Sequence, residues 1–159
     1  MKMIITLTGH KHCGKEYIAE KFGMNADARV VTPYTDKPVT SDVEQSSYFD
    51  YHFVSRDKLD KMIENGSVLC STIINGNRYV FFEWQLIVPY NVLIVDDYQL
   101  VDLQSNWKGK IYTIKVISKN QVESDRIGEY YYNHEFDEVF DYDMDSYDEL
   151  EARISYGFR

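Results

Sequence analysis

Apolar runs of strand length alternate with helix-like stretches along most of the chain. The run from Met3 to Thr8 predicts a buried strand, because it contains only apolar residues and threonine. A helix is expected from Glu16 to Phe22 and is predicted to end at Gly23, a residue suited to a left-handed cap. Further strands are predicted at 29–32, 91–95, 111–117 and 136–140, and a terminal helix at 146–156. This alternation predicts a parallel sheet that is covered on both faces.

The middle of the chain departs from that alternation. Strands are predicted at 50–54, 68–74 and 77–82, and Asn75-Gly76 between the last two is a strong signal for a tight hairpin. Ser55 is expected to cap a helix that runs to Asn65. The remaining expectations are a break in regular structure at 33–38, a mobile loop up to 50, a short turn or helix at 84–89 and a short helix at 119–128. The stretch 50–83 is therefore interpreted as an inserted small lobe.

The size and charge of the chain restrict its function. One domain is the natural interpretation of 159 residues, and 44% hydrophobic with 27% charged residues is typical of a globular protein. A net charge of −9 argues against binding to nucleic acid. No apolar run has the length of a membrane span, and no secretory cleavage pattern follows Met1, so a cytoplasmic protein is expected. Cys13 and Cys70 have no metal-binding spacing and are expected to be free thiols.

The candidate chemistry lies between the first strand and the first helix. This loop begins at Gly9 and ends at Gly14-Lys15, and a strand, a glycine-bounded loop and a helix form the context of a phosphate-binding loop. Backbone N–H groups converge on an anion at such a helix N-terminus. The position after Lys15 usually carries a hydroxyl but here is Glu16, whose carboxylate is a candidate ligand for Mg²⁺. The predicted ATP- and phosphate-binding residues are Gly9, His10, Lys11, His12, Cys13, Gly14, Lys15 and Glu16. The alternative is an ordinary strand-to-helix turn that contains two glycines.

Three blocks after this loop carry a family likeness. They are 50–55 (Asp-Tyr-His-Phe-Val-Ser), 61–66 (Lys-Met-Ile-Glu-Asn-Gly) and 75–79 (Asn-Gly-Asn-Arg-Tyr). In this order, after a phosphate loop and before a strand that ends in aspartate, they resemble guanylate kinase over roughly residues 1–117. The resemblance implies an α/β P-loop fold of three layers with a central parallel sheet and an inserted small β-rich lobe that binds a nucleoside monophosphate. The single domain 1–159 would have its core at 1–32 and 84–159 and its lobe at 33–83.

The resemblance implies phosphoryl transfer from ATP with Mg²⁺, so the ligands are expected to be nucleotides. Lys15 would contact the donor phosphates, and Tyr51 and Tyr79 would hold the acceptor phosphate through their hydroxyls. Thr32 falls near a base-reading position, and Asp97 falls near a carboxylate that contacts the guanine edge or helps to organise the metal. Packing within the hairpin is the alternative for the two tyrosines, and a solvated strand end is the alternative for Asp97.

Departures from the family pattern make the acceptor harder to specify. Lys37 is the one cation where the family has two arginines, and Cys70 replaces its base-reading glutamate, so the acceptor is not expected to be strictly GMP. The family also has a basic lid after the strand that corresponds to 111–117, and this chain leaves little room for it. Arg126 is the one arginine in that stretch, and it is either catalytic or paired with Glu123. The predicted catalytic residues are Lys15 and Arg126, the metal ligands Glu16 and Asp97, and the acceptor-binding residues Thr32, Lys37, Tyr51, Cys70, Arg78, Tyr79 and Asp97. The predicted function is a divergent nucleoside monophosphate kinase. The alternative is an inactive guanylate-kinase-like binding module, and the oligomeric state stays open.

Overall fold

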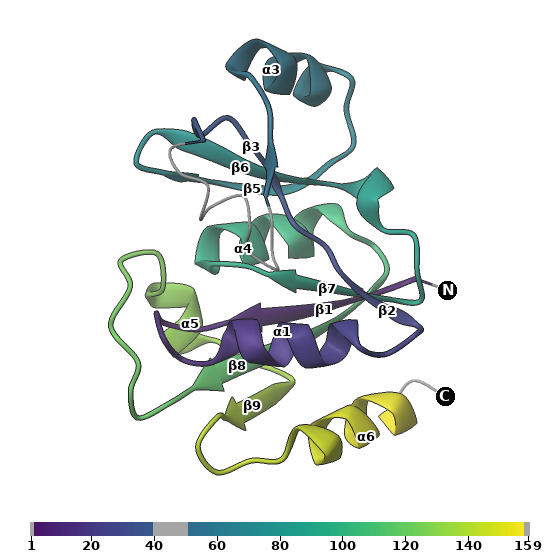
Figure 1. Cartoon of the computed structure of the whole chain (residues 1–159), viewed down its shortest axis with the longest axis vertical. Helices are drawn as coiled ribbons and strands as arrows, with labels where there is room; N and C mark the ends of the chain where they lie inside the picture. Colours follow the sequence, from purple (N-terminus) through teal and green to yellow (C-terminus); the bar gives the residue numbers. More distant parts are fainter. Residues whose placement is uncertain (1, 40–50, 158–159) are drawn as a thin grey trace.

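The computed structural model describes residues 2–39 and 51–157, which form two β-sheets with helices packed around them (Figure 1). The central sheet has five strands in the order β2-β7-β1-β8-β9, and every neighbouring pair in it is parallel. Its strands are β1 (Met3–Thr8), β2 (Ala28–Val30), β7 (Tyr90–Ile94), β8 (Lys110–Ile117) and β9 (Glu138–Asp141). The predicted parallel sheet is confirmed, with the N-terminal strand at its centre.

The two faces of the central sheet are covered by different elements, because successive residues of a strand point to opposite faces. Met3, Ile5 and Leu7 pack in one cluster with α1 (Lys15–Gly23) and α6 (Tyr147–Gly157). Ile4 belongs to a second cluster, together with α4 (Asp97–Asn106) and the base of the second sheet. The result is a three-layer arrangement in which the loop after β1 emerges at the carboxyl edge of the sheet.

The second sheet has the strand order β4-β3-β6-β5 and lies with α3 at one end of the longest axis (Figure 1). Its hairpin turns at Asn75 and Gly76, which both have positive φ (51° and 82°), as the sequence predicts. The Oγ of Ser55 accepts a hydrogen bond from the backbone N–H of Lys58, so the predicted helix cap is also confirmed. The elements are β3 (Tyr34–Thr35), β4 (His52–Phe53), α3 (Arg56–Glu64), β5 (Val68–Ile74), β6 (Asn77–Phe82) and the 3₁₀ turn η1 (Glu83–Gln85).

Two expectations about regular structure are wrong, one helix was not predicted, and one expectation cannot be compared. No helix forms at 119–128; this stretch is irregular, and a short helix, α5 (Glu129–Asn133), follows it. The sequence interpretation missed helix α4 altogether, and the stretch 33–38, expected to lack regular structure, contains the two-residue strand β3. The predicted mobile loop up to residue 50 lies largely outside the described residues.

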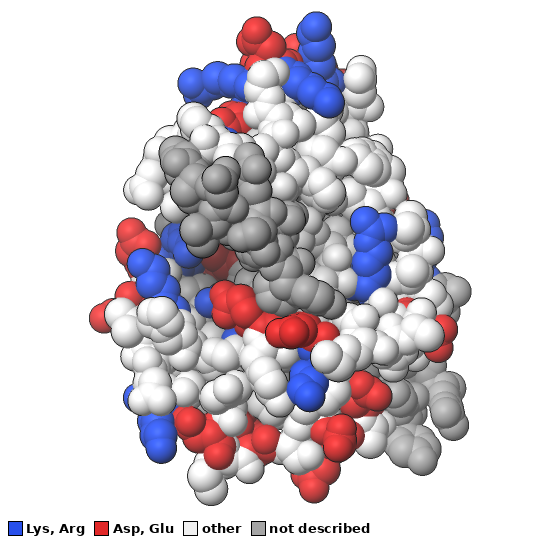
Figure 2. All heavy atoms as spheres, viewed as in Figure 1, with Lys and Arg blue, Asp and Glu red and all other residues white. Residues whose placement is uncertain are grey.

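The charged surface is uneven. Acidic side chains gather over the lower part of the face in Figure 2, where β9 and α6 lie in Figure 1. The thiols of Cys13 and Cys70 are both free and buried. No helix among the described residues is both long and apolar enough to cross a bilayer.

Candidate functional site

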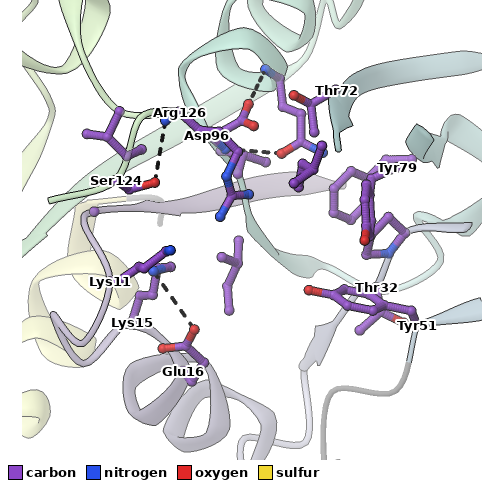
Figure 3. Close-up of a pocket in the computed structure, with 18 of the residues that line it drawn as sticks. Lys11, Lys15, Glu16, Thr32, Tyr51, Thr72, Tyr79, Asp96, Ser124 and Arg126 are labelled. Atoms are coloured by element: carbon purple, nitrogen blue, oxygen red, sulfur yellow. Dashed lines mark hydrogen bonds and ion pairs between the residues drawn. The ribbon is translucent and has the colours of Figure 1, made fainter. Parts of the chain in front are cut away.

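A cavity of about 530 Å³ lies between the carboxyl edge of the central sheet and the second sheet. Figure 3 shows Lys11 and Lys15 on one side of this space and Tyr51 and Tyr79 on the other. Residues far apart in the sequence therefore share one cavity. Its polar lining consists of Lys11, His12, Lys15, Glu16, Thr32, Lys37, Tyr51, Thr72, Tyr79, Asp96, Gln99, Ser124 and Arg126.

The loop after β1 has the features of an anion-binding turn. His12 and Gly14 both have positive φ (60° and 97°), and α1 begins without a side-chain cap. The backbone N–H groups of His12, Gly14 and Glu16 take part in no hydrogen bond between described residues. The Nζ of Lys15 donates to the carbonyl of His10 at 3.2 Å, which holds it beside the loop. Free amide donors at a helix N-terminus, next to a lysine, are suited to binding phosphate.

Both glycines of this loop are required by their surroundings. A Cβ on Gly9 would lie 2.5 Å from the carbonyl oxygen of Val116 on β8 and 2.6 Å from the Sγ of Cys13. A Cβ on Gly14 would meet the ring of Tyr142, and the φ of Gly14 is also unfavourable for any other residue. The tight turn therefore depends on Gly9 for space and on Gly14 for both space and backbone conformation.

Two predicted phosphate-binding residues point away from the cavity. The imidazole of His10 is buried, and it bonds the hydroxyl of Tyr132 through Nε2 (2.7 Å) and the backbone N–H of Ser124 through Nδ1 (3.0 Å). The thiol of Cys13 packs in the core under the loop, and burial raises its pKa. These two side chains therefore support the loop from below, and the prediction that the loop binds phosphate rests on its backbone N–H groups.

The acceptor side of the cavity brings together most of the residues that the resemblance suggested. Tyr51 and Tyr79 meet edge to face, with ring centroids 5.4 Å apart, and both line the cavity. Burial raises the pKa of Tyr51, and the neighbouring Tyr79 adds to the effect, so its hydroxyl stays protonated at neutral pH. Thr32 and Lys37 also line this part of the cavity. Two phenol donors and a lysine therefore face the same space as the phosphate loop.

Cys70 and Arg78 do not line the cavity, which corrects their assignment to acceptor binding. Cys70 is fully buried in the core cluster beneath the second sheet, where burial raises the pKa of its thiol. The guanidinium of Arg78 binds Asp36 at 2.8 Å and Asp60 at 2.6 Å. Partial burial raises the pKa of Asp36, but the hydrogen bonds and the charge of Arg78 have the larger effect. The pKa of Asp36 therefore lies below its usual value. Arg78 therefore clamps the second sheet to α3.

Asp97 is also absent from the cavity lining, and its neighbour Asp96 lines the cavity instead. The Oδ2 of Asp97 accepts from the backbone N–H of Gly128 (2.8 Å) and of Tyr131 (3.3 Å), at the start of α5. The Oδ1 of Asp96 caps α4 by accepting from the N–H of Gln99 at 2.9 Å, while its Oδ2 has no partner among the described residues. The pKa of Asp96 is raised overall, because burial outweighs the lowering effects of Gln99, Thr72 and Arg126.

Sequence reasoning missed Asp96, Gln99, Thr72 and Ser124 as cavity residues. The sequence does carry a signal for Asp96 and Gln99. An aspartate followed three positions later by glutamine is typical of a helix N-terminus, and this helix begins directly after the end of a predicted strand. Thr72 and Ser124 carry no comparable signal. They reach the cavity only through the pairing of β5 with β6 and through the course of the irregular stretch 118–128.

Arg126 is half-buried and extends from the irregular stretch before α5 into the cavity (Figure 3). No ion pair joins it to Glu123 among the described residues, and it does not lie on a helix, so the alternative of a helix-surface pair is wrong. Lys11, Lys15 and Lys37 line the same cavity, and the acidic side chains there are Glu16 and Asp96. The cavity therefore concentrates positive charge in a chain whose net charge is −9, as a polyanionic ligand requires.

No family model matches the chain, and no match was found among curated proteins. Solved structures do match, among them the guanylate kinase of Anaplasma phagocytophilum, with a TM-score of 0.65 and 16% sequence identity. The match covers 99% of this chain and 85% of that one. At this identity the likeness establishes the fold: the chain has a guanylate-kinase-like α/β P-loop fold with a central parallel sheet, as the sequence blocks indicate.

Proposed function

We propose that the chain is a nucleoside monophosphate kinase that transfers a phosphoryl group from ATP to a ribo- or deoxyribonucleoside monophosphate. The observation that carries the proposal is the shared cavity, with Lys15 and the phosphate loop on one side and Tyr51 and Tyr79 on the other (Figure 3). Phosphoryl transfer needs two phosphate-bearing ligands held in line, and little covalent chemistry from the protein. A cavity of about 530 Å³ is also within the roughly 300–1,000 Å³ typical of small-molecule sites.

The proposed roles follow from the two sides of the cavity. The N–H groups of the phosphate loop and Lys15 hold the donor phosphates. The hydroxyls of Tyr51 and Tyr79, with Lys37, hold the acceptor phosphate. Arg126 extends into the same space and would stabilise the charge on the transferring group. Loss of one such donor typically lowers turnover by about 10²- to 10³-fold.

Magnesium is implied by this chemistry, and the residues present fit it. Glu16 and Asp96 supply carboxylates at the cavity, and the Oδ2 of Asp96 is buried without a partner among the described residues. Mg²⁺ is usually held by one or two carboxylates, substrate phosphates and water, so Glu16 and Asp96 would hold it here. When bound, the ion neutralises charge on the phosphates. The metal assignment therefore moves from Asp97 to Asp96.

The acceptor is proposed not to be strictly GMP. Cys70 falls where the resemblance places a base-reading glutamate, and it is buried in the core. Thr32, Thr72 and Asp96 are among the polar groups that line the cavity. Strand β5 has no carboxylate, and a thiol cannot replace the two hydrogen bonds that the family's glutamate would make to guanine.

A nucleotide-binding module without transferase activity is the second candidate. It is favoured by the Glu16 carboxylate, which lies 3.9 Å from the Nζ of Lys15 and offsets part of its charge. Such a module would bind ATP–Mg²⁺ in calorimetry but give no turnover. An interaction module that has lost the nucleotide site would not bind ATP–Mg²⁺.

The test is a coupled assay with ATP–Mg²⁺ and each common ribo- and deoxyribonucleoside monophosphate. Turnover is expected with at least one acceptor, and Lys15→Met is expected to abolish it. Lys108→Met is the matched control, because Lys108 is exposed and does not line the cavity. Absence of turnover with every acceptor at high enzyme concentration would refute the kinase.

A further inference from the structure

The irregular stretch 118–128 is fastened to the phosphate loop. The N–H of Lys11 donates to the carbonyl of Val122 at 3.0 Å, and the N–H of Val122 donates back at 2.7 Å. Next to this two-bond bridge, the N–H of Ser124 donates to the Nδ1 of His10 at 3.0 Å. Backbone and side chain of the loop therefore hold consecutive parts of the same stretch.

The bonding of His10 fixes its protonation state. A backbone N–H can only donate, so the Nδ1 that faces Ser124 must be an acceptor and the ring must carry its proton on Nε2. That proton is donated to the hydroxyl of Tyr132 at 2.7 Å. Burial lowers the pKa of His10; the charge of Lys15 acts in the same direction, while Glu123 and Asp97 raise it. The imidazole is therefore neutral at pH 7 and suited to hold the Ser124 amide.

The amide held by His10 is two residues from Arg126. The N–H of Arg126 donates to the Oγ of Ser124 at 3.4 Å, and the carbonyl of Arg126 accepts from the N–H of Asp97 at 3.4 Å. On the other side, the N–H of Gly128 donates to Asp97 at 2.8 Å. The backbone on both sides of Arg126 is thus anchored, with His10 on one side and Asp97 on the other.

We propose that His10 is a positioning residue, which fixes Ser124 against the phosphate loop and thereby holds Arg126 at the cavity before nucleotides bind. The role of Arg126 toward a transferring phosphoryl group rests on the proposed function. The mechanical coupling of His10 to Arg126 does not depend on it.

Two substitutions of His10 each keep one of the two hydrogen bonds that the imidazole makes. Asparagine places an acceptor near the position of Nδ1 and keeps the bond to Ser124. Glutamine reaches the position of Nε2 and keeps the bond to Tyr132. We expect His10→Asn to keep most of the kcat, and His10→Gln to lose about 10²-fold in kcat, the typical cost of a small misplacement, with little change in the KM for ATP. Tyr132→Phe, which removes only the second bond, is the control and is expected to be near wild type.

A double-mutant cycle tests whether the loss of kcat in His10→Gln arises through Arg126. If His10 acts through Arg126, then His10→Gln costs no further kcat in an Arg126→Ala background. Independent, additive losses would overturn the proposal. Thermal unfolding of each variant checks that it folds. If His10→Gln does not fold, a pH series on the wild type decides: kcat should fall as His10 is protonated, and a His10→Asn variant should not show this fall.

Amide hydrogen exchange tests the coupling without turnover. His10→Gln should accelerate exchange at Ser124, whereas His10→Asn should leave it protected. If the wild type shows no kinase activity, the proposed function fails, and exchange at Ser124 still tests the inference. Equal exchange at Ser124 in the glutamine and asparagine variants would overturn it.

Discussion

Gly9→Ala is predicted to destabilise the protein through lack of space alone. Gly9 follows β1, and its added methyl group would lie 2.5 Å from the Val116 carbonyl oxygen and 2.6 Å from the Cys13 sulfur. The first neighbour belongs to the backbone of β8, and the second is a fully buried thiol in the core. Neither is the free end of a flexible side chain, so the loop or the strand must move.

The expected cost is about 1–3 kcal/mol, the usual range for inserting a methyl group into a packed interior. For a chain of 159 residues, each kcal/mol lowers the melting temperature by roughly 2–4 °C, so a decrease of about 2–12 °C is expected. Displacement of the loop by the added methyl group would also move its backbone N–H groups. The affinity for ATP–Mg²⁺ should therefore fall together with the stability.

Lys108→Ala is the control. Lys108 is exposed and does not line the cavity, so this substitution is expected to change stability by no more than about 0.5 kcal/mol. Thermal unfolding and calorimetric titration with ATP–Mg²⁺ measure both variants. Equal melting temperatures for the two variants would show that the contacts assigned to Gly9 are wrong.

Three further predictions concern the charges. Glu16→Ser is expected to keep or raise ATP–Mg²⁺ affinity in calorimetry, because the serine hydroxyl can replace the carboxylate beside Mg²⁺ and the negative charge 3.9 Å from the Lys15 ammonium is removed; a sharp loss would show that a carboxylate, and not a hydroxyl, is needed to hold the metal. Urea unfolding should show stability falling as pH drops below about 6.5. Burial lowers the pKa of His10 and His52, so the unfolded chain takes up protons that the native chain does not; equal stability at pH 7.5 and 5.5 would contradict this. Arg78→Ala should cost about 3 kcal/mol, because it leaves a buried carboxylate unpaired, whereas Arg153→Ala breaks a more exposed pair and should cost under about 1 kcal/mol.

Much of the fold could be predicted because local signals agree with the tertiary structure. β1 is a short apolar run at the centre of the sheet, where burial on both faces matches its pattern. The hairpin at Asn75 needs positive φ at two residues, which Asn-Gly provides. The helix expected at 119–128 failed because its backbone bonds go elsewhere: Val122 pairs with the phosphate loop, and Lys119 donates to Asp143.

The candidate site was harder to predict, since a position in the sequence does not fix the direction of a side chain. Asp96 and Asp97 are neighbours, yet one faces the cavity and the other caps α5. Arg78 and Tyr79 show the same contrast on β6, where adjacent residues point to opposite faces. His10 lies within the phosphate-loop pattern, but its role depends on partners more than a hundred positions away.

The central place of β1 in its sheet has a consequence for synthesis. Its neighbours are β7 and β8, which are both made after β1, so β1 finds both partners only after residue 117 has been made. Until then at least one edge of β1 has no partner, and unpaired edges promote aggregation. Nascent chains arrested before β8 should therefore depend on chaperones, whereas chains released after β8 should not.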